Sequence, residues 1–96
     1  HPTEIEDILQ RHPGVREAGV CSTRRATGVT TLRAFVALTD EASPEHVRAE
    51  LLATARDTLT WYKVPEDIVF VEQLPRTPTG KLRRREVRAM AGAWSA

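Results

Sequence analysis

The chain has 96 residues, of which 41% are hydrophobic and 28% are charged, and its formal net charge at pH 7 is +1. This composition predicts one small soluble globular domain and excludes disordered, collagen-like and membrane-spanning chains. A domain of this size has little room for an enclosed substrate cavity, and the single cysteine excludes an internal disulfide and a thiolate metal cluster.

The first predicted element is a helix that begins near Thr3. Thr3 and Glu6 have the spacing of a capping box, in which each side chain bonds the other residue's backbone N–H. Pro13-Gly14 is expected to end the helix. The acidic residues of the first turn are expected to stabilise the helix dipole rather than to have a function. Three apolar residues form one stripe along this helix: Ile5, Ile8 and Leu9.

Two strands are predicted next. Val15 to Ser22 follows the Pro-Gly breaker and favours a strand, which Gly19 weakens. Residues 23–31 are polar and predict a loop. Leu32 to Leu38 is a nearly continuous apolar run, which is typical of a central strand covered on both faces.

A second helix, a third strand and a last helix complete the predicted fold. Ser43-Pro44 is a strong helix start, and the helix is expected to run to about Thr60. Ile68 to Glu72 is the third strand, and the order strand, helix, strand implies a right-handed crossover between parallel strands. Arg84 to Met90 predicts the last helix, followed by a fraying tail over 91–96. The predicted fold class is α+β, a single domain with a three-stranded sheet core and flanking helices in the order α-β-β-α-β-α.

The stretch that stands out chemically is residues 74–85, where two prolines and one glycine surround Lys81. Proline limits the freedom of a loop, while glycine allows either a close approach to a ligand or a positive φ. Residues 76–88 also hold six basic residues against Glu86 alone, so this segment carries a net charge of +5 and the rest of the chain carries −4. The concentration of charge indicates an anionic partner, although a solvated helix face is an equally good interpretation of such a run alone.

Other chemistries fit the sequence poorly. In a nucleotide-binding phosphate loop, Pro75 would have to be glycine and Leu82 would have to be Ser or Thr. No metal site is predicted, because His1, His12 and His46 lack the spacing of a zinc motif. Cys21 lies in an apolar strand and is expected to be a buried, inert thiol.

The segment 74–84, Leu-Pro-Arg-Thr-Pro-Thr-Gly-Lys-Leu-Arg-Arg, resembles the last core motif of the acyl-adenylate-forming (AMP-binding) superfamily. That superfamily includes acyl- and aryl-CoA ligases, luciferases and peptide-synthetase adenylation domains. Segments 2–6, 12–18, 34–36 and 62–65 resemble further family segments in the expected order, so the likeness spans nearly the whole chain. Arg76, Arg83 and Arg84 make the motif more similar to a CoA ligase than to a peptide synthetase. The loop 23–29 departs from the family pattern, because Val29 replaces an acidic residue.

The resemblance implies that residues 1–96 are the mobile C-terminal domain of an acyl-CoA synthetase, with the large N-terminal domain absent. Lys81 would be the catalytic lysine of adenylation, supported in its loop by Thr79 and Gly80. ATP and CoA would be substrates, with Mg²⁺ in the large domain, and this part alone is expected to bind none of them and to be inactive. Acetylation of Lys81, which mass spectrometry can detect, would remove the charge that the reaction uses.

Several questions stay open at this point. The carboxylic acid, the residues that contact CoA, and the choice between CoA and a carrier protein as acceptor cannot be predicted from these residues. An alternative is a standalone basic module that binds nucleic acid or another polyanion through Arg83, Arg84, Arg85 and Arg88, although no aromatic residue is interleaved with these arginines. We expect a cytoplasmic protein without a membrane or nucleic-acid partner, and an isolated domain could self-associate through the face that the large domain would cover.

Overall fold

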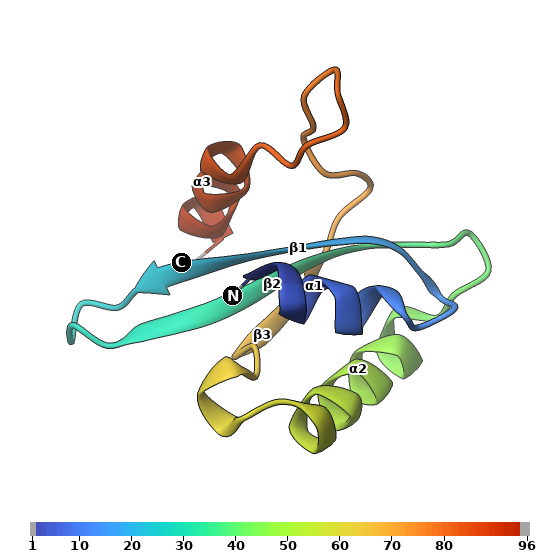
Figure 1. The fold of residues 1–96 in the computed structure, drawn as a ribbon, viewed down its shortest axis with the longest axis horizontal. Coiled ribbons are helices and arrows are strands. Elements are labelled where there is room, and N and C mark those ends of the chain that lie inside the picture. Colours follow the sequence, from blue (N-terminus) through green and yellow to red (C-terminus); the bar gives the residue numbers. More distant parts are fainter. Residues whose placement is uncertain (1, 95–96) are drawn as a thin grey trace.

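The computed structural model describes residues 2–94 of the chain, so His1 and the last two residues of the predicted tail lie outside it. The order of helices and strands is the predicted one, α-β-β-α-β-α, with one turn of 3-10 helix inserted (Figure 1). The elements are α1 (Pro2–Gln10), β1 (Val15–Arg24), β2 (Thr30–Leu38), α2 (Pro44–Thr58), η1 (Trp61–Lys63), β3 (Asp67–Phe70) and α3 (Arg84–Trp94).

The sheet has the strand order β1-β2-β3, so β2 is the central strand as its apolar run predicts. β1 and β2 are antiparallel and are joined by a short loop in which Gly28 has a φ of +89°. β2 and β3 are parallel, with α2 as the connection between them. The prediction of parallel strands across the second helix is therefore confirmed.

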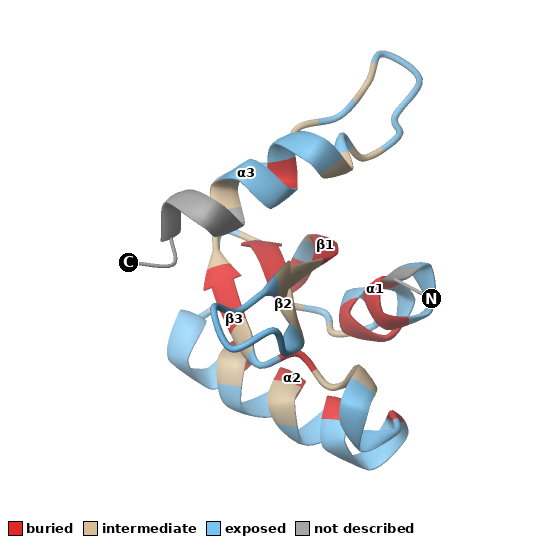
Figure 2. Cartoon of the chain, turned by 90° about the vertical axis from the view of Figure 1, so that its left-hand side faces the viewer, coloured by how far each residue is buried: buried red, intermediate tan, exposed pale blue. Residues whose placement is uncertain are grey.

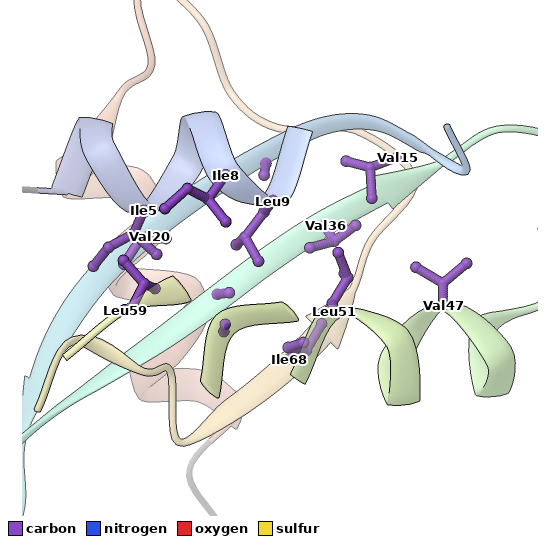
Figure 3. Packing of buried hydrophobic residues seen from close by; sticks show 13 residues of the cluster. Ile5, Ile8, Leu9, Val15, Val20, Val36, Val47, Leu51, Leu59 and Ile68 are labelled. Carbon is purple, nitrogen blue, oxygen red and sulfur yellow. The ribbon is translucent and has the colours of Figure 1, made fainter. Parts of the chain in front are cut away.

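Helices cover both faces of the sheet. α1 and α2 pack on one face, where their apolar stripes meet the sheet in the cluster that Figure 3 shows around Leu9, Val36 and Leu51. α3 lies on the opposite face (Figure 2), where Val87 packs with Phe35 and Cys21. Phe35, Val36 and Val87 are each at most 1% exposed, so the small sheet has a separate core on each side.

The ends of several elements differ from the predicted ones. β1 and β2 extend to Arg24 and from Thr30, which shortens the predicted loop, because the antiparallel ladder pairs these polar residues as well. β3 ends at Phe70 rather than Glu72, and α2 ends at Thr58. α3 continues past Met90 to Trp94, so the described part of the predicted tail is helical.

The prediction of a capping box at the N-terminus of α1 is wrong. α1 begins at Pro2, so Thr3 lies inside the helix rather than at its cap. Glu6 does not reach back to the helix start; its carboxylate accepts a hydrogen bond from the Val20 N–H of β1 at 2.7 Å. A partner on β1 takes this carboxylate in place of the local one, which the spacing alone could not show. None of the helices described is long and apolar enough to cross a membrane.

Candidate functional site

Residues 76–82 form a short hairpin, called here the lysine hairpin, which carries Lys81. Arg76 and Leu82 pair at its base as an isolated antiparallel bridge. The hairpin projects from the body of the domain between β3 and α3, and its tip is exposed (Figures 1 and 2). The predicted site residues Thr79, Gly80 and Lys81 all lie within it.

The hairpin has the geometry of a three-residue loop, Pro78-Thr79-Gly80. The Thr77 N–H donates to the Lys81 carbonyl at 2.7 Å, and the Gly80 N–H donates to the Thr77 carbonyl at 2.9 Å. Proline presets the turn at the first loop position, and glycine supplies the left-handed conformation at the third, where φ is +90°. A Cβ added at Gly80 would meet no heavy atom within 4 Å. Within this chain, the conformation and not a close approach is therefore what requires glycine.

The backbone of Lys81 is held on both sides, but its side chain is not. Its carbonyl accepts from Thr77, and its N–H donates to the Thr77 Oγ1 at 3.0 Å. Lys81 is exposed, and within residues 2–94 no hydrogen bond or ion pair involves its ammonium. Thr79 supports the lysine indirectly, since its hydroxyl lies 3.0 Å from that of Thr77. Thr77 was not predicted as a supporting residue, although a hydroxyl near a turn is a known local hydrogen-bond partner of the backbone.

Two leucines, Leu74 just before the hairpin and Leu82 at its base, attach it to the sheet. A Cβ at Gly19 of β1 would lie 2.9 Å from the Leu82 Cδ2 and 3.4 Å from the Leu74 Cδ1. Both leucines therefore pack directly on the backbone of the strand, and Leu82 lies closer than a Cβ at this position would allow without a shift. Gly19 was predicted only to weaken β1; its role in seating the hairpin depends on residues more than 50 positions away.

Just after the hairpin, Arg84 begins α3 and pairs with Glu6 of α1. The Arg84 Nη1 donates to the Glu6 Oε2 at 2.7 Å, and Nη2 donates to Oε1 at 3.1 Å. The same Nη1 lies 3.2 Å from the Val20 carbonyl of β1, to which it also donates. The hydrogen bond with Glu6 raises the pKa of the Arg84 guanidinium above its ordinary value. This fork joins α3, α1 and β1, so Arg84 is an anchor of the fold.

The other basic residues of the segment do not form one uniform binding surface. Arg76 pairs with Glu17 at 2.8 Å, and Arg83 lies 3.5 Å from Glu86. Together with Arg84, this places half of the six basic residues in contact with carboxylates. Arg85 and Arg88 are exposed on α3. The basic residues are thus concentrated in this segment of the sequence, but half of them are paired with carboxylates of the same domain.

The cysteine is buried, as predicted. Cys21 is 3% exposed in the core beneath α3, and burial raises the pKa of its thiol. A thiol with a raised pKa holds less thiolate at a given pH and is a poorer nucleophile. In the described part of the chain, no three His, Cys, Asp or Glu side chains come together as potential metal ligands.

Comparisons with known proteins identify the family of the chain. The profile of the AMP-binding enzyme C-terminal domain family matches residues 4–81. A 2-succinylbenzoate–CoA ligase of Geobacillus kaustophilus is 43% identical over 90 residues, which cover 94% of this chain and 18% of that protein. A benzoate CoA ligase from Burkholderia xenovorans superposes with a TM-score of 0.82 at 43% identity, over 91% of this chain and 18% of that one.

A further solved structure is an anthranilate CoA ligase in complex with anthranoyl-AMP. It superposes with a TM-score of 0.86 at 32% identity, and the match covers 96% of this chain and 19% of the ligase. The chain thus spans less than a fifth of the length of these relatives. Because the family profile covers most of the chain, the chain belongs to the family of AMP-binding enzyme C-terminal domains.

Proposed function

We propose that residues 1–96 act as the mobile C-terminal domain of an acid–CoA ligase and that Lys81 serves its adenylation step. The observation that carries this proposal is the contrast within Lys81, whose backbone is fixed by Thr77 while its ammonium has no partner in the described chain. A side chain held out in this way is available to a second body. The remaining four fifths of a protein like its relatives would supply that body, including the sites for ATP, Mg²⁺ and the carboxylic acid.

The chemistry of adenylation suits a lysine. The substrate carboxylate attacks the α-phosphorus of ATP, a C–O–P linkage forms, and the bond to pyrophosphate breaks. Negative charge develops on oxygens of both reactants, and a compact ammonium on a long stem can contact both at once. Its work is positioning and charge stabilisation, because phosphoryl-type transfer leaves little covalent chemistry for the protein.

The second half-reaction would not need Lys81. The CoA thiol replaces AMP on the acyl carbon. The family that the chain resembles is known for domain alternation, in which the small domain rotates between the two steps and withdraws the lysine. A rigid hairpin on a small module suits such an alternation, because the lysine moves with the domain as one unit. We propose CoA as the acceptor because the relatives named above are CoA ligases. A chain with one unpaired cysteine also fits a reducing compartment, and we place the enzyme in the cytoplasm.

The test is Lys81→Ala in the full-length enzyme, with both half-reactions measured separately. The adenylation rate, measured by ATP–pyrophosphate exchange, should fall by about 100-fold or more. This is the loss typical of removing one preorganised charge-stabilising donor. Thioester formation from supplied acyl-adenylate should change by less than about threefold, because by the proposal Lys81 is withdrawn during that step. An equal loss in both half-reactions would overturn the role given to Lys81.

The chain offers a matched control, since Lys63 is its only other lysine. Lys63 lies in η1, where its ammonium is 3.4 Å from the Glu4 carboxylate. Lys63→Ala removes the same charge and stem from the same domain and should leave adenylation within about twofold of wild type, as surface substitutions usually do. The alternative of a standalone nucleic-acid-binding module is not supported by the comparisons, which match the chain to a family of AMP-binding enzymes and to CoA ligases.

A further inference from the structure

A β-bulge in β1 decides which side chain faces the lysine hairpin. The register of β1 on β2 shifts between Val15 and Glu17, so one extra residue is inserted there. In a regular strand Val15 and Glu17 would share a face. The bulge instead lets Val15 join Ala18 in the core beneath α1 and α2, which leaves Glu17 on the face of Gly19, under the hairpin.

The Glu17 carboxylate binds the base of the hairpin with both oxygens. Its Oε2 accepts from the Leu74 N–H at 3.3 Å, and its Oε1 accepts from the Arg76 Nε at 2.8 Å. The Glu17 side chain is 17% exposed, against 36% for Arg76. The pair is therefore partly shielded from solvent, which makes it stronger than an open surface ion pair.

Arg76 carries this contact onward to the residue before the lysine. Its Nη1 donates to the Gly80 carbonyl at 3.0 Å. That carbonyl belongs to the same planar peptide as the Lys81 N–H, which donates to the Thr77 Oγ1. The Gly80–Lys81 peptide is thus held at both ends, and a chain of two side chains links it to β1.

We propose that Glu17 is a positioning residue for adenylation, which acts through Arg76 to fix the peptide that carries Lys81. This inference rests on the proposed role of Lys81. Glu17 does not contact the substrates; it orients the guanidinium, and the guanidinium sets the plane from which the lysine stem leaves the backbone. Leu74 and Leu82 seat the hairpin on the sheet, whereas Glu17 and Arg76 set the orientation of its tip.

The experiment uses the full-length enzyme with Glu17→Gln and Arg76→Lys. Glutamine replaces one of two accepting oxygens with an NH₂ donor, so it must lose the bond to Leu74 or to Arg76. Lysine keeps the positive charge at position 76, but its single ammonium lacks the fork that reaches Glu17 and Gly80 together. Glu50→Gln is the matched control, because Glu50 also pairs with a side chain, His12, at 3.0 Å but lies on α2 away from the hairpin.

Each variant should lower the adenylation rate about tenfold, since a misplacement of 1 Å can cost about 100-fold and the hairpin keeps its other bonds. The KM for the carboxylic acid should not change, and neither should the rate of the thioester half-reaction. In the Lys81→Ala background, Glu17→Gln should have no further effect on adenylation, because a residue that acts through the lysine has nothing left to position. Glu50→Gln should match wild type in both backgrounds.

The outcomes separate this inference from the proposed function. Adenylation within twofold of wild type in the folded variants, or an undiminished loss in the Lys81→Ala background, would overturn the role of Glu17 while leaving Lys81 in place. The proposed function of Lys81 would fail by a different result: the Lys81→Ala variant alone would then adenylate at the wild-type rate. Thermal melting checks that the variants are folded, and if Glu17→Gln is not, Arg76→Lys, at a more exposed position, decides the question.

Discussion

Lys81 and Arg84 lie three residues apart in one basic segment, and the structure uses them in opposite ways. The Arg84 guanidinium makes three hydrogen bonds, two to the Glu6 carboxylate and one to the Val20 carbonyl. The Lys81 ammonium makes none within the described residues. The same charge in the same segment therefore anchors the fold at Arg84, whereas at Lys81 it makes no contact within the described residues and, by the proposal, serves the large domain.

The difference follows from where each residue stands relative to the sheet. Arg84 begins α3, which packs across β1, and so its side chain reaches the Glu6 carboxylate, which is only 11% exposed. Lys81 stands near the tip of a hairpin whose contacts with the sheet are made at its base, by Leu74 and Leu82 on Gly19 and by Arg76 with Glu17. A domain that carries a reactive group to another body needs both features, since the group stays accessible only if something else fixes its carrier.

The contrast between Arg84 and Lys81 is tested first by the variant with the largest expected effect, Arg84→Ala, which should lower the stability of the domain. Arg84→Ala leaves Glu6 buried without its cation, and loss of one partner of a buried pair typically costs about 3–5 kcal/mol. Because the Arg84 side chain is 39% exposed, solvent screening reduces this, and we expect a loss of about 2 kcal/mol in the free energy of unfolding. For a domain of this size, that lowers Tm by about 10 °C.

Arg85→Ala is the matched control for that measurement. Arg85 is the next residue of the same helix and is exposed, so its removal should stay within about 0.5 kcal/mol of wild type. Thermal and denaturant unfolding of the chain measure both variants. An equal loss for Arg84→Ala and Arg85→Ala would mean that the fork to Glu6 contributes nothing beyond general helix charge.

A smaller effect is expected from two glycines with the same backbone geometry. Gly80 and Gly28 have φ values of +90° and +89°, and a Cβ at either would meet nothing within 4 Å. Alanine at either position is therefore strained only by its conformation and should cost about 1 kcal/mol. Unfolding should show nearly the same loss for both.

The two glycine variants should differ in the full-length enzyme. Gly80→Ala distorts the loop that carries Lys81 and should slow adenylation, whereas Gly28→Ala strains the loop between β1 and β2 and should leave adenylation unchanged. A matched decrease in both would show that general destabilisation, and not the geometry of the lysine hairpin, limits the rate.

Local patterns predicted the helices, the strands and the turn that carries Lys81. The apolar run 32–38 is the central strand, the stripe of α1 is buried, and Pro78 and Gly80 form the turn that their residue types favour. Each of these features depends on neighbours in the chain, so residue type and spacing contain the necessary information. The prediction that Lys81 acts in adenylation is not tested by the fold.

The contacts that attach the site were not predictable from spacing. Glu6 satisfied the pattern of a local capping box, but its partners are Val20 and Arg84, the latter 78 positions away. Glu17 gave no signal, because the bulge that directs it becomes visible only when β1 pairs with β2. Long-range partners are chosen by the packing of whole elements, and a single sequence does not show which of several charged residues will meet.

The smallest effect on stability is expected for Lys81→Ala, the counterpart of Arg84→Ala in this contrast. Lys81→Ala removes a side chain with no described partner, so the free energy of unfolding should change by less than about 0.5 kcal/mol.

The reactivity of Cys21 offers a sensitive measure of this change in stability. The thiol is buried beneath α3 with a raised pKa, so it should react with an alkylating reagent only when the domain opens. The labelling rate of Lys81→Ala should stay within about twofold of wild type, whereas Arg84→Ala should raise it about 30-fold, the population change that about 2 kcal/mol gives. Faster labelling of Lys81→Ala would show that the lysine stabilises the domain that carries it, and the division between anchor and presented group would then fail.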